Sequence, residues 1–169
     1  MKTARLPSNV IPCRPQHLMY LVQRMREDER AQFNALSGLE AFDEDVAVRW
    51  CIDAASQSGR YAVTVLNDDN TPAAAGGFQP AGVGVYQAWM VGTAEGWGGQ
   101  WRSLTKATRW LIDRVFESGA HRVQTSAITS REQAIEWFER SLGFMPEGVW
   151  RHYGIKGEDV AHFSRLRGE

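Results

Sequence analysis

The sequence predicts one α/β domain, in which a mixed, mostly antiparallel sheet of about seven strands is flanked by about four helices. A chain of 169 residues is long enough to bury about two-thirds of its unfolded surface in a single core, so residues 1–169 are expected to form one domain. Hydrophobic residues make up 43% of the chain and charged residues 23%, which is typical of a globular protein. Segments with helical and with strand-like spacing alternate along the chain, and this order indicates the α/β class.

The N-terminal third is predicted to be mostly helical after one short strand. Residues 9–11 are the strand candidate, and a proline closes it. Apolar residues with helical spacing then mark the segments 18–25 and 47–54. The charged segment 26–36 continues helically between them until Gly38 ends it. Its charge run, residues 27–30, is interpreted as a solvated helix face, and the alternative is a contact with a partner.

Three consecutive antiparallel strands are predicted in the middle of the chain. Residues 61–66 and 73–78 flank an Asn-Asp-Asp-Asn turn at 67–70, which indicates a β-hairpin. A longer strand is expected at 85–92. These three segments are therefore expected to lie side by side in the sheet.

The C-terminal half is predicted to alternate helices and strands. Positions 101–116 keep helical spacing over about four turns, and a glycine ends them. A strand at 121–128 and a helix at 134–142 follow. The chain is expected to close as a hairpin of 148–155 and 160–166, in which residues 151–153 form an exposed edge that could contact another chain.

Charge and composition exclude several classes of function. The 19 basic and 20 acidic side chains nearly cancel, so no overall field favours nucleic acid or an anionic membrane. The four histidines lack the spacing of metal ligands, and Cys13 and Cys51 are isolated, so we expect no metal site and two buried thiols. Residues 1–8 lack the apolar core of a signal peptide, and no apolar run approaches the ~18 residues of a membrane span, so a cytoplasmic protein is expected.

A glycine-rich segment between a strand and a helix is the strongest candidate for a ligand site. At such a junction free backbone N–H groups and the helix dipole both point at a bound anion. The segment matches neither of the nucleotide-binding patterns G-x-x-x-x-G-K-[ST] and G-x-G-x-x-G, and the alternative is a turn that only reverses the chain. The candidate cofactor-binding residues are Met90, Val91, Gly92, Gly96, Gly98, Gly99, Gln100 and Trp101.

Seven tryptophans are unusual for a chain of this length. Trp50, Trp110 and Trp137 fall at core-facing helical spacings, so they are interpreted as packing residues. Trp97 lies inside the glycine-rich segment and is a candidate contact with a ligand or partner.

The order of elements over residues 9–167 resembles that of the GNAT acetyltransferases. The segment 134–144, which ends in Leu-Gly-Phe, is similar to the late helix of that family. The resemblance implies a sheet whose fourth strand splays from the fifth, and a following loop and helix that hold the pyrophosphate of acetyl-CoA. It therefore makes acetyl-CoA the expected cofactor, without a metal.

A closer resemblance is to GNAT-like proteins of short-tailed bacteriophages, which include internal virion proteins. Residues 25–30 resemble their early M-R-x-x-D motif, 89–93 their W-x-x-G-T motif, and 135–144 their I-x-W-[LF]-E-x-L-G-F motif. The resemblance implies a protein of the virion or its assembly, located in the virion and the host cytoplasm. Phage structural proteins or further copies of the chain would be its partners.

Departures from the acetyltransferase pattern favour a degenerate catalytic site. Glu95 stands where the family has Gln or Arg in the pyrophosphate loop, and the late helix has Trp137 and Phe138 where a tyrosine usually protonates the leaving thiolate. The candidate catalytic residues that remain are the hydroxyl-bearing Thr93, Ser130 and Tyr153. The sequence thus favours a virion-associated protein, and the alternative is an acetyl-CoA-dependent N-acetyltransferase.

Overall fold

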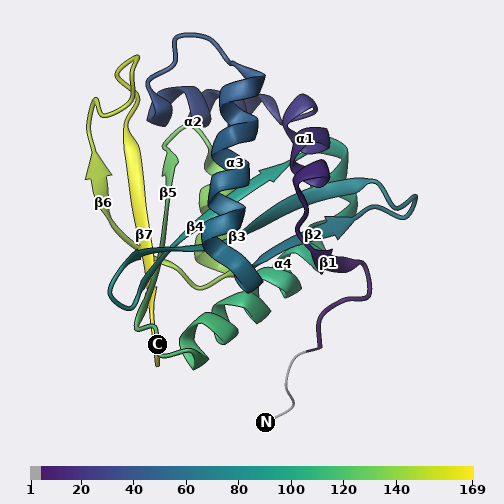
Figure 1. Ribbon diagram of the computed structural model, residues 1–169. Coiled ribbons are helices and arrows are strands. Elements are labelled where there is room, and N and C mark those ends of the chain that lie inside the picture. The colour runs from purple at the N-terminus through teal and green to yellow at the C-terminus, as the bar shows by residue number, and fades with distance from the viewer. Residues whose placement is uncertain (1–4) are drawn as a thin grey trace.

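The computed structural model describes residues 5–169, and its helices and strands follow the predicted order (Figure 1). The strands are β1 (Val10–Pro12), β2 (Ala62–Leu66), β3 (Pro72–Gly82), β4 (Val85–Gly92), β5 (Arg122–Ile128), β6 (Met145–Trp150) and β7 (Val160–Leu166). The helices are α1 (Pro15–Gln23), α2 (Glu27–Ser37), α3 (Glu44–Ser58), α4 (Ala94–Glu117) and α5 (Glu132–Glu136). A 3₁₀ turn at Gly59–Tyr61 and a π-helical turn at Trp137–Ser141 complete the fold, and the expected fold class is confirmed.

The sheet has seven strands in the order β1-β2-β3-β4-β5-β7-β6, and only the β4–β5 pair is parallel. β3 and β4 pair along nearly their whole lengths, from Gly82↔Val85 to Ala74↔Gly92. β4 and β5 pair only over Val85–Gln87 and then diverge, as Figure 1 shows. The second half of β4 therefore has one open edge in the middle of the sheet.

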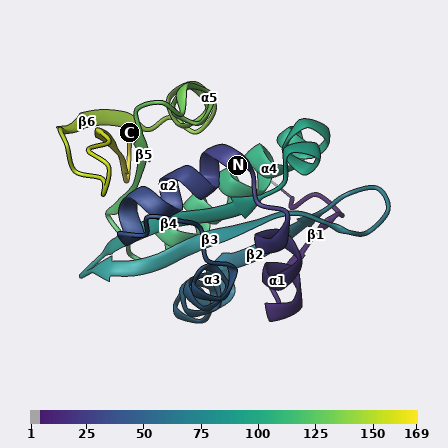
Figure 2. The ribbon, with the colours of Figure 1, turned by 90° about the horizontal axis from the view of Figure 1, so that it is seen from above.

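Helices cover both faces of the sheet. Seen from above, α1 and α3 lie on one side of β2–β4 and α4 on the other (Figure 2). Side chains alternate between the two faces along β4: Trp89 and Val91 pack with α1 and α3, whereas Ala88 and Met90 pack on the side of α4. Among residues 5–169, no helix combines the length and the apolar character that a membrane span requires.

α1 and α2 are separate helices, so the fold has five helices where about four were expected. The chain is extended at Arg26, with φ −57° and ψ 145°, and the Arg26 N–H donates a hydrogen bond to the Gly92 carbonyl at 3.2 Å. This bond attaches the start of α2 to the open edge of β4. Figure 2 shows α2 lying over β4.

The glycine-rich segment 96–99 is helical, and the prediction of a loop there was wrong. α4 begins at Ala94, because Thr93 caps it: Thr93 Oγ1 accepts from the Gly96 N–H at 2.9 Å, and the Thr93 carbonyl accepts from the Trp97 N–H at 2.9 Å. Gly96 is needed for packing, because a Cβ there would lie 2.4 Å from the Ala73 carbonyl oxygen. The first turn of α4 therefore packs directly against β3.

The closing hairpin begins and turns earlier than predicted. β6 covers 145–150 instead of 148–155, so residues 151–153 belong to the loop that follows it, and β6 itself is the edge strand. The loop reaches back to α2, where the Ile155 N–H donates to the Ala35 carbonyl at 3.1 Å. The late helix is α-helical only to Glu136 and ends in a π turn, in which the Leu142 N–H donates to the Trp137 carbonyl at 3.1 Å.

Candidate functional site

A cavity of about 420 Å³ lies where β4 and β5 diverge. It extends through the sheet, from α2 and the middle of α3 on one face to α4 and the segment Ala134–Leu142 on the other, and its wall is mostly apolar. This volume lies within the ~300–1,000 Å³ range of small-molecule sites. Its polar wall residues include Glu29, Gln32 and Arg131, together with Thr108, Thr125 and Ser126.

The open edge of β4 presents backbone groups to this cavity. Gly92 uses its N–H for Glu29 and its carbonyl for Arg26, so its polar groups point away from β3. Because backbone direction repeats every two residues in a strand, the N–H and C=O of Met90 point to the same open edge. Met90 lines the cavity, and its backbone is the place where an extended ligand could bind in the position of a missing strand.

Glu29 is the buried carboxyl of the site. It projects from α2, is only 7% exposed, and its Oε2 accepts a hydrogen bond from the Gly92 N–H at 2.9 Å. Burial raises the pKa of Glu29 to about 7, although the charges of Arg131 and Arg26 and the bond from Gly92 act to lower it. A carboxyl with this pKa is partly ionised at neutral pH, so it can accept a proton from a substrate.

Glu29 was not predicted as a site residue from the sequence. The charge run 27–30 was interpreted as a solvated face, and that interpretation is wrong for this residue. One signal was present, because Glu29 and Phe33 are four residues apart in α2 and so lie on one helix face. The apolar neighbour at this spacing indicates that the carboxyl lies on the buried side of α2.

Two guanidinium groups flank Glu29 and share one carboxylate. Arg131 Nε lies 2.8 Å from Asp28 Oδ2, and Arg26 Nε lies 3.3 Å from Asp28 Oδ1. Arg131 Nη1 also donates to Gln32 Oε1 at 3.0 Å. The side chains of Arg26 and Arg131 are 15% and 11% exposed, and both line the cavity.

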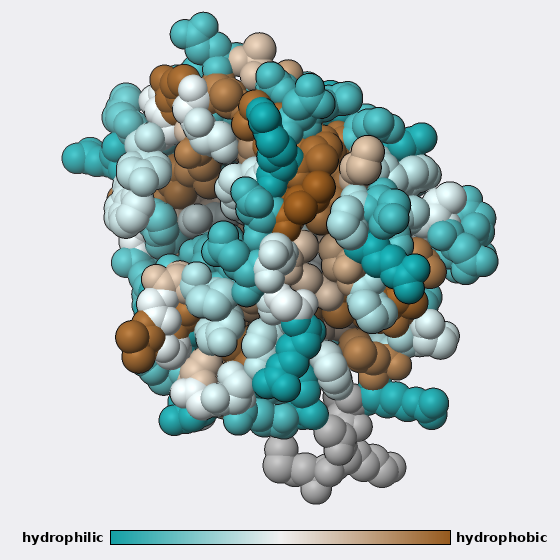
Figure 3. All heavy atoms as spheres, in the orientation of Figure 1, coloured by the Kyte–Doolittle hydropathy of each residue, from teal (hydrophilic) through white to brown (hydrophobic). Residues whose placement is uncertain are grey.

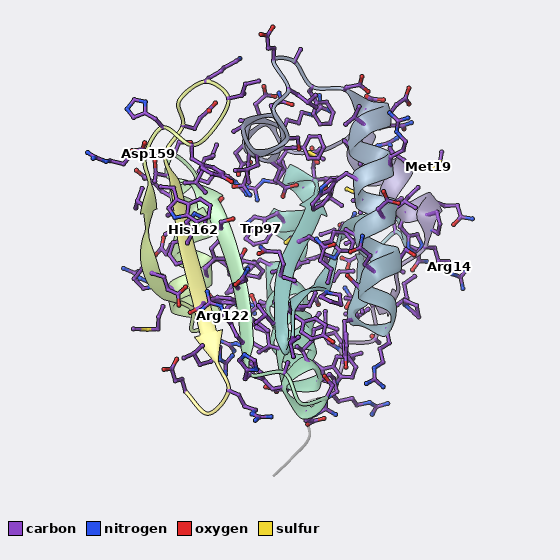
Figure 4. All side chains as sticks on the ribbon, turned by 60° about the vertical axis from the view of Figure 1, so that its left-hand side comes forward. Arg14, Met19, Trp97, Arg122, Asp159 and His162 are labelled. Carbon is purple, nitrogen blue, oxygen red and sulfur yellow. The ribbon has the colours of Figure 1, made fainter. Side chains whose placement is uncertain are left out.

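Two tryptophans separate this cavity from a shallower one of about 350 Å³ beside the start of α4. The Trp97 and Trp137 rings meet edge to face with centroids 4.8 Å apart, and both line both cavities. Trp137 Nε1 donates to Thr105 Oγ1 at 2.9 Å, and the Arg26 guanidinium lies 5.2 Å from the Trp97 ring. Figure 4 looks toward the gap between β4 and β5, in which the labelled Trp97 appears.

Solved structures share this arrangement of elements. A probable GNAT-family acetyltransferase from Chromobacterium violaceum ATCC 12472 matches with a TM-score of 0.70 at 20% identity, covering 100% of this chain and 94% of that one. A GNAT phosphinothricin acetyltransferase from Sinorhizobium meliloti, solved in complex with AcCoA, gives a TM-score of 0.72 at 13% identity, covering 93% and 86%. A ribosomal-protein-alanine N-acetyltransferase from Brucella melitensis gives 0.69 at 14%, covering 93% and 98%. The chain has the GNAT fold.

At these identities the likeness establishes the GNAT fold and leaves the activity open. No protein-family model matches the sequence, and no curated protein sequence matches it significantly. The three solved GNAT structures are acetyltransferases by name, and none is a virion protein. The expected partners, phage structural proteins or further copies of the chain, stay predictions, as does a location in the virion.

The eight cofactor-binding candidates fall into different environments of the GNAT fold. Met90 lines the larger cavity, and Gly98 and Trp101 line the shallower one. Trp101 is 46% exposed. Gly99 is exposed, and a Cβ added to it would meet nothing within 4 Å. These residues are the candidates that a ligand could reach directly.

The other four candidates already have partners within the protein. Val91 is fully buried against α1 and α3, and Gly96 packs against Ala73. Gly92 holds Glu29, and Gln100 Nε2 donates to Asp68 Oδ1 at 3.2 Å, beside the β2–β3 turn. Their positions indicate a structural contribution to the site.

The candidate catalytic residues do not meet in the cavity. Thr93 is 4% exposed and caps α4, Ser130 lies exposed in the turn before α5, and Tyr153 is 56% exposed with its ring 4.7 Å from that of Trp150. None of the three lines either cavity. A catalytic role for them stays a prediction, and Glu29 is the titratable group that the structure adds.

The tryptophans and thiols also differ in part from expectation. Trp50 is 42% exposed at the mouth of the larger cavity, so its interpretation as a packing residue was wrong. Trp110 and Trp137 pack against the core on the α4 side, as expected. Cys51 is buried and Cys13 half-buried, and within residues 5–169 no group of three or more His, Cys, Asp or Glu side chains could hold a metal ion.

Proposed function

We propose that this protein is an N-acyltransferase that moves an acetyl group from acetyl-CoA to an amine at the β4–β5 divergence. The observation that carries the proposal is the position of Glu29, a buried carboxyl with a pKa of about 7 on the wall of a cavity that the open edge of β4 also lines. The fold supports it, since the three solved structures described above are named acetyltransferases. These observations favour an enzyme over the virion-associated role, which stays a prediction.

The chain's surfaces fit a long, thin thioester. Trp97 and Trp137 form the wall that the two cavities share, so an extended ligand would reach from the start of α4 to the open edge of β4 once these two rings move apart. Thr93 accepts hydrogen bonds from the backbone N–H groups of Gly96 and Trp97. The backbone N–H groups of Ala94 and Glu95 therefore remain as the free donors of the first turn of α4, where an anion could bind. Arg140, 80% exposed on the rim of the shallower cavity, pairs with Glu136 of the same rim at 2.7 Å and is the basic residue that a phosphate there could contact.

Acetyl-CoA would supply a thioester whose carbonyl carbon is open to attack by an amine. Glu29 would accept the proton that the amine loses as the new C–N bond forms and the C–S bond breaks. The backbone N–H of Met90 would donate to the carbonyl oxygen, on which negative charge develops. Both groups are fixed in advance, one by the Gly92 bond and the other by the strand.

The missing tyrosine does not exclude this reaction. Among residues 5–169, no tyrosine lines either cavity, so none of these residues offers the departing sulfur a phenol to protonate it. A thiol ionises near pH 8.5, and a thiolate is therefore a far better leaving group than an alkoxide or amide. Transfer can proceed with the base alone, at a rate limited by the lack of an acid.

Calorimetry and a rate measurement test the proposal together. We expect saturable binding of acetyl-CoA at micromolar concentrations, and we expect the Gly98→Glu variant, which adds a carboxylate to the shallower cavity, to abolish it. The Glu29→Gln variant should still bind acetyl-CoA, and its rate of thiol release with an amine acceptor should fall by about 10²-fold or more. The matched control is Glu27→Gln, an exposed glutamate on the same helix whose loss should change neither quantity. No heat at millimolar acetyl-CoA, or full activity of Glu29→Gln, would refute the proposal.

A further inference from the structure

The end of the cavity at α2 holds a compact group of charges whose balance indicates the kind of amine that fits there. The group consists of Arg26, Asp28, Glu29 and Arg131. On the basis of the proposed acyl transfer, we propose that the acceptor is a free α-amino acid with an apolar or aromatic side chain, whose carboxylate Arg26 and Arg131 bind while its amino group faces Glu29.

The first step of the argument is the net charge. With Glu29 ionised, two guanidiniums face two carboxylates, and the group is neutral. An amino acid zwitterion adds no net charge to it, whereas a simple alkylamine enters as an unmatched cation. Unmatched charge is costly in a poorly solvated site, so the zwitterion is the favoured amine.

The second step concerns the group after proton transfer. Once Glu29 carries the proton of the amine, Asp28 is the only carboxylate of the group that faces Arg26 and Arg131. A carboxylate on the acceptor would restore the balance at the moment when it is lost. An acceptor without one would leave a buried excess of positive charge.

The third step is that each guanidinium keeps an N–H donor that is not hydrogen-bonded within the part of the protein that the structure describes. Arg131 uses Nε for Asp28 and Nη1 for Gln32, and Arg26 uses Nε for Asp28 and Nη2 for Gln133. Arg131 Nη2 and Arg26 Nη1 make no hydrogen bond with any of residues 5–169. Charge-assisted bonds from guanidinium to carboxylate are among the stronger polar contacts, and both arginines line the cavity.

The fourth step is geometry along α2. Arg26 is the residue that precedes α2 and Glu29 is the third residue of the helix, and both are attached to Gly92: the Arg26 N–H donates to the Gly92 carbonyl, and the Glu29 carboxyl accepts from the Gly92 N–H. Arg131 is held against the same turn through Asp28 and Gln32. The carboxylate site and the proton acceptor are therefore adjacent, as are the two charged groups of an α-amino acid.

The mouth of the cavity supplies the apolar part of the site. Trp50 is 42% exposed there, and its ring meets the ring of Phe33, one turn of α2 after Glu29, with centroids 6.0 Å apart. In the view of Figure 3, hydrophobic side chains reach the surface between hydrophilic ones. An apolar or aromatic side chain of the acceptor would cover this surface.

Three small ligands that differ only at the carboxylate test the proposal. L-Phenylalanine, L-phenylalaninamide and phenethylamine share the amine and the ring, and each is titrated by calorimetry into the protein alone and with saturating CoA, which cannot be turned over. We expect L-phenylalanine to bind about tenfold or more tightly than either analogue, since only it offers a carboxylate to the guanidiniums. Equal or tighter binding of either analogue, or no heat from L-phenylalanine, would overturn the proposal.

Variants of the two arginines test whether they are the source of the preference for a carboxylate. Arg131→Gln and Arg26→Gln should each reduce the preference for L-phenylalanine over its amide to about twofold or less, and thermal unfolding shows whether each variant is folded. The matched control is Arg24→Gln, which removes an exposed arginine outside the cavity and should keep the preference. A preference that survives in both cavity variants would contradict the assignment, and the ligand comparison on the native protein needs neither variant.

The same measurements separate this inference from the proposed function. Acetylation of phenethylamine without binding of L-phenylalanine would overturn the inference and leave acyl transfer standing. Binding of L-phenylalanine with the expected preference, but no heat from acetyl-CoA, would support the amino acid site and refute the acyltransferase.

Discussion

Glu29 Oε2 lies 2.9 Å from the backbone nitrogen of Gly92 and occupies the position at which a neighbouring strand would have paired with β4. A helix thereby satisfies one donor of an open strand edge with a side chain. The same contact places an ionisable group in a cavity whose wall is mostly apolar. Structure and chemistry are coupled at this point, so changes to Glu29 should be visible both in stability and in activity.

The stability of the Glu29→Gln variant relative to the native protein should increase as pH rises. Burial raises the pKa of Glu29 to about 7 in the folded protein, above its ordinary value of 4.5, so the folded state holds more protons than the unfolded state between these values. The contribution of the protonated carboxyl is therefore complete below pH 4.5 and is lost as pH rises through 7. Glutamine keeps an acceptor for Gly92 and does not ionise, so its advantage in the free energy of unfolding should grow by at most about 3 kcal/mol from pH 4.5 to 8.

Urea unfolding of both proteins at pH 5 and pH 8 measures this growth. The control is the exposed Glu27→Gln, for which the difference from the native protein should be nearly the same at both pH values. If Glu29→Gln behaves like the control, the carboxyl is not buried as described.

Activity should depend on the same ionisation. The proposed base must be deprotonated to accept a proton, so kcat/KM for an amine acceptor should rise with pH along an acid limb with a midpoint near 7, the pKa of Glu29. Rates measured from pH 5.5 to 9 with an acceptor whose own ionisation is known would show it. A limb that follows only the ionisation of the acceptor, unchanged in Glu29→Gln, would rule out this role.

The order of elements could be predicted from the sequence, because periodicity and punctuation by glycine are local signals, and the resemblance of that order to the acetyltransferases implied the GNAT fold. Apolar spacing located α3, α4 and the three central strands well. The start of α4 was missed because Gly96 signals a loop when considered alone, whereas in the structure it is a close contact with Ala73. Contacts between segments distant in sequence decide such cases.

The candidate site was predicted only in part, for the same reason. The backbone of Met90 could be anticipated from the strand before the glycine-rich segment. Arg26, Asp28 and Arg131 could not, since the pairing of Asp28 with Arg131 joins residues about a hundred positions apart. Glu29 gave a helical-spacing signal, but the neighbouring charges concealed it.

Gly96→Ala should destabilise the protein, whereas Gly99→Ala should not. A Cβ at Gly96 would lie 2.4 Å from the Ala73 carbonyl oxygen and 2.6 Å from its Cα, and neither backbone atom can move without disturbing β3. We expect a loss of about 1–3 kcal/mol in the free energy of unfolding. At Gly99 the added Cβ meets nothing within 4 Å, so the better helix propensity of alanine should stabilise by about 0.5–1 kcal/mol. Denaturant unfolding of the pair measures both, and equal effects would contradict the described packing of α4 on β3.

Ser58→Ala should destabilise the protein, because Ser58 on α3 accepts a hydrogen bond from Trp89 on β4. Trp89 Nε1 donates to Ser58 Oγ at 2.8 Å, and Trp89 and Ser58 are only 6% and 4% exposed. Removing the hydroxyl leaves the indole N–H buried without a partner, which should cost about 1–3 kcal/mol in the free energy of unfolding. The matched control is Ser56→Ala, two residues earlier on the exposed side of α3, where the change should be neutral or stabilising by about 0.5 kcal/mol. Urea denaturation compares the two variants. If Ser58→Ala costs no more stability than Ser56→Ala, the indole N–H has found another partner. The hydrogen bond between α3 and β4 would then not be what holds Trp89 beside the cavity.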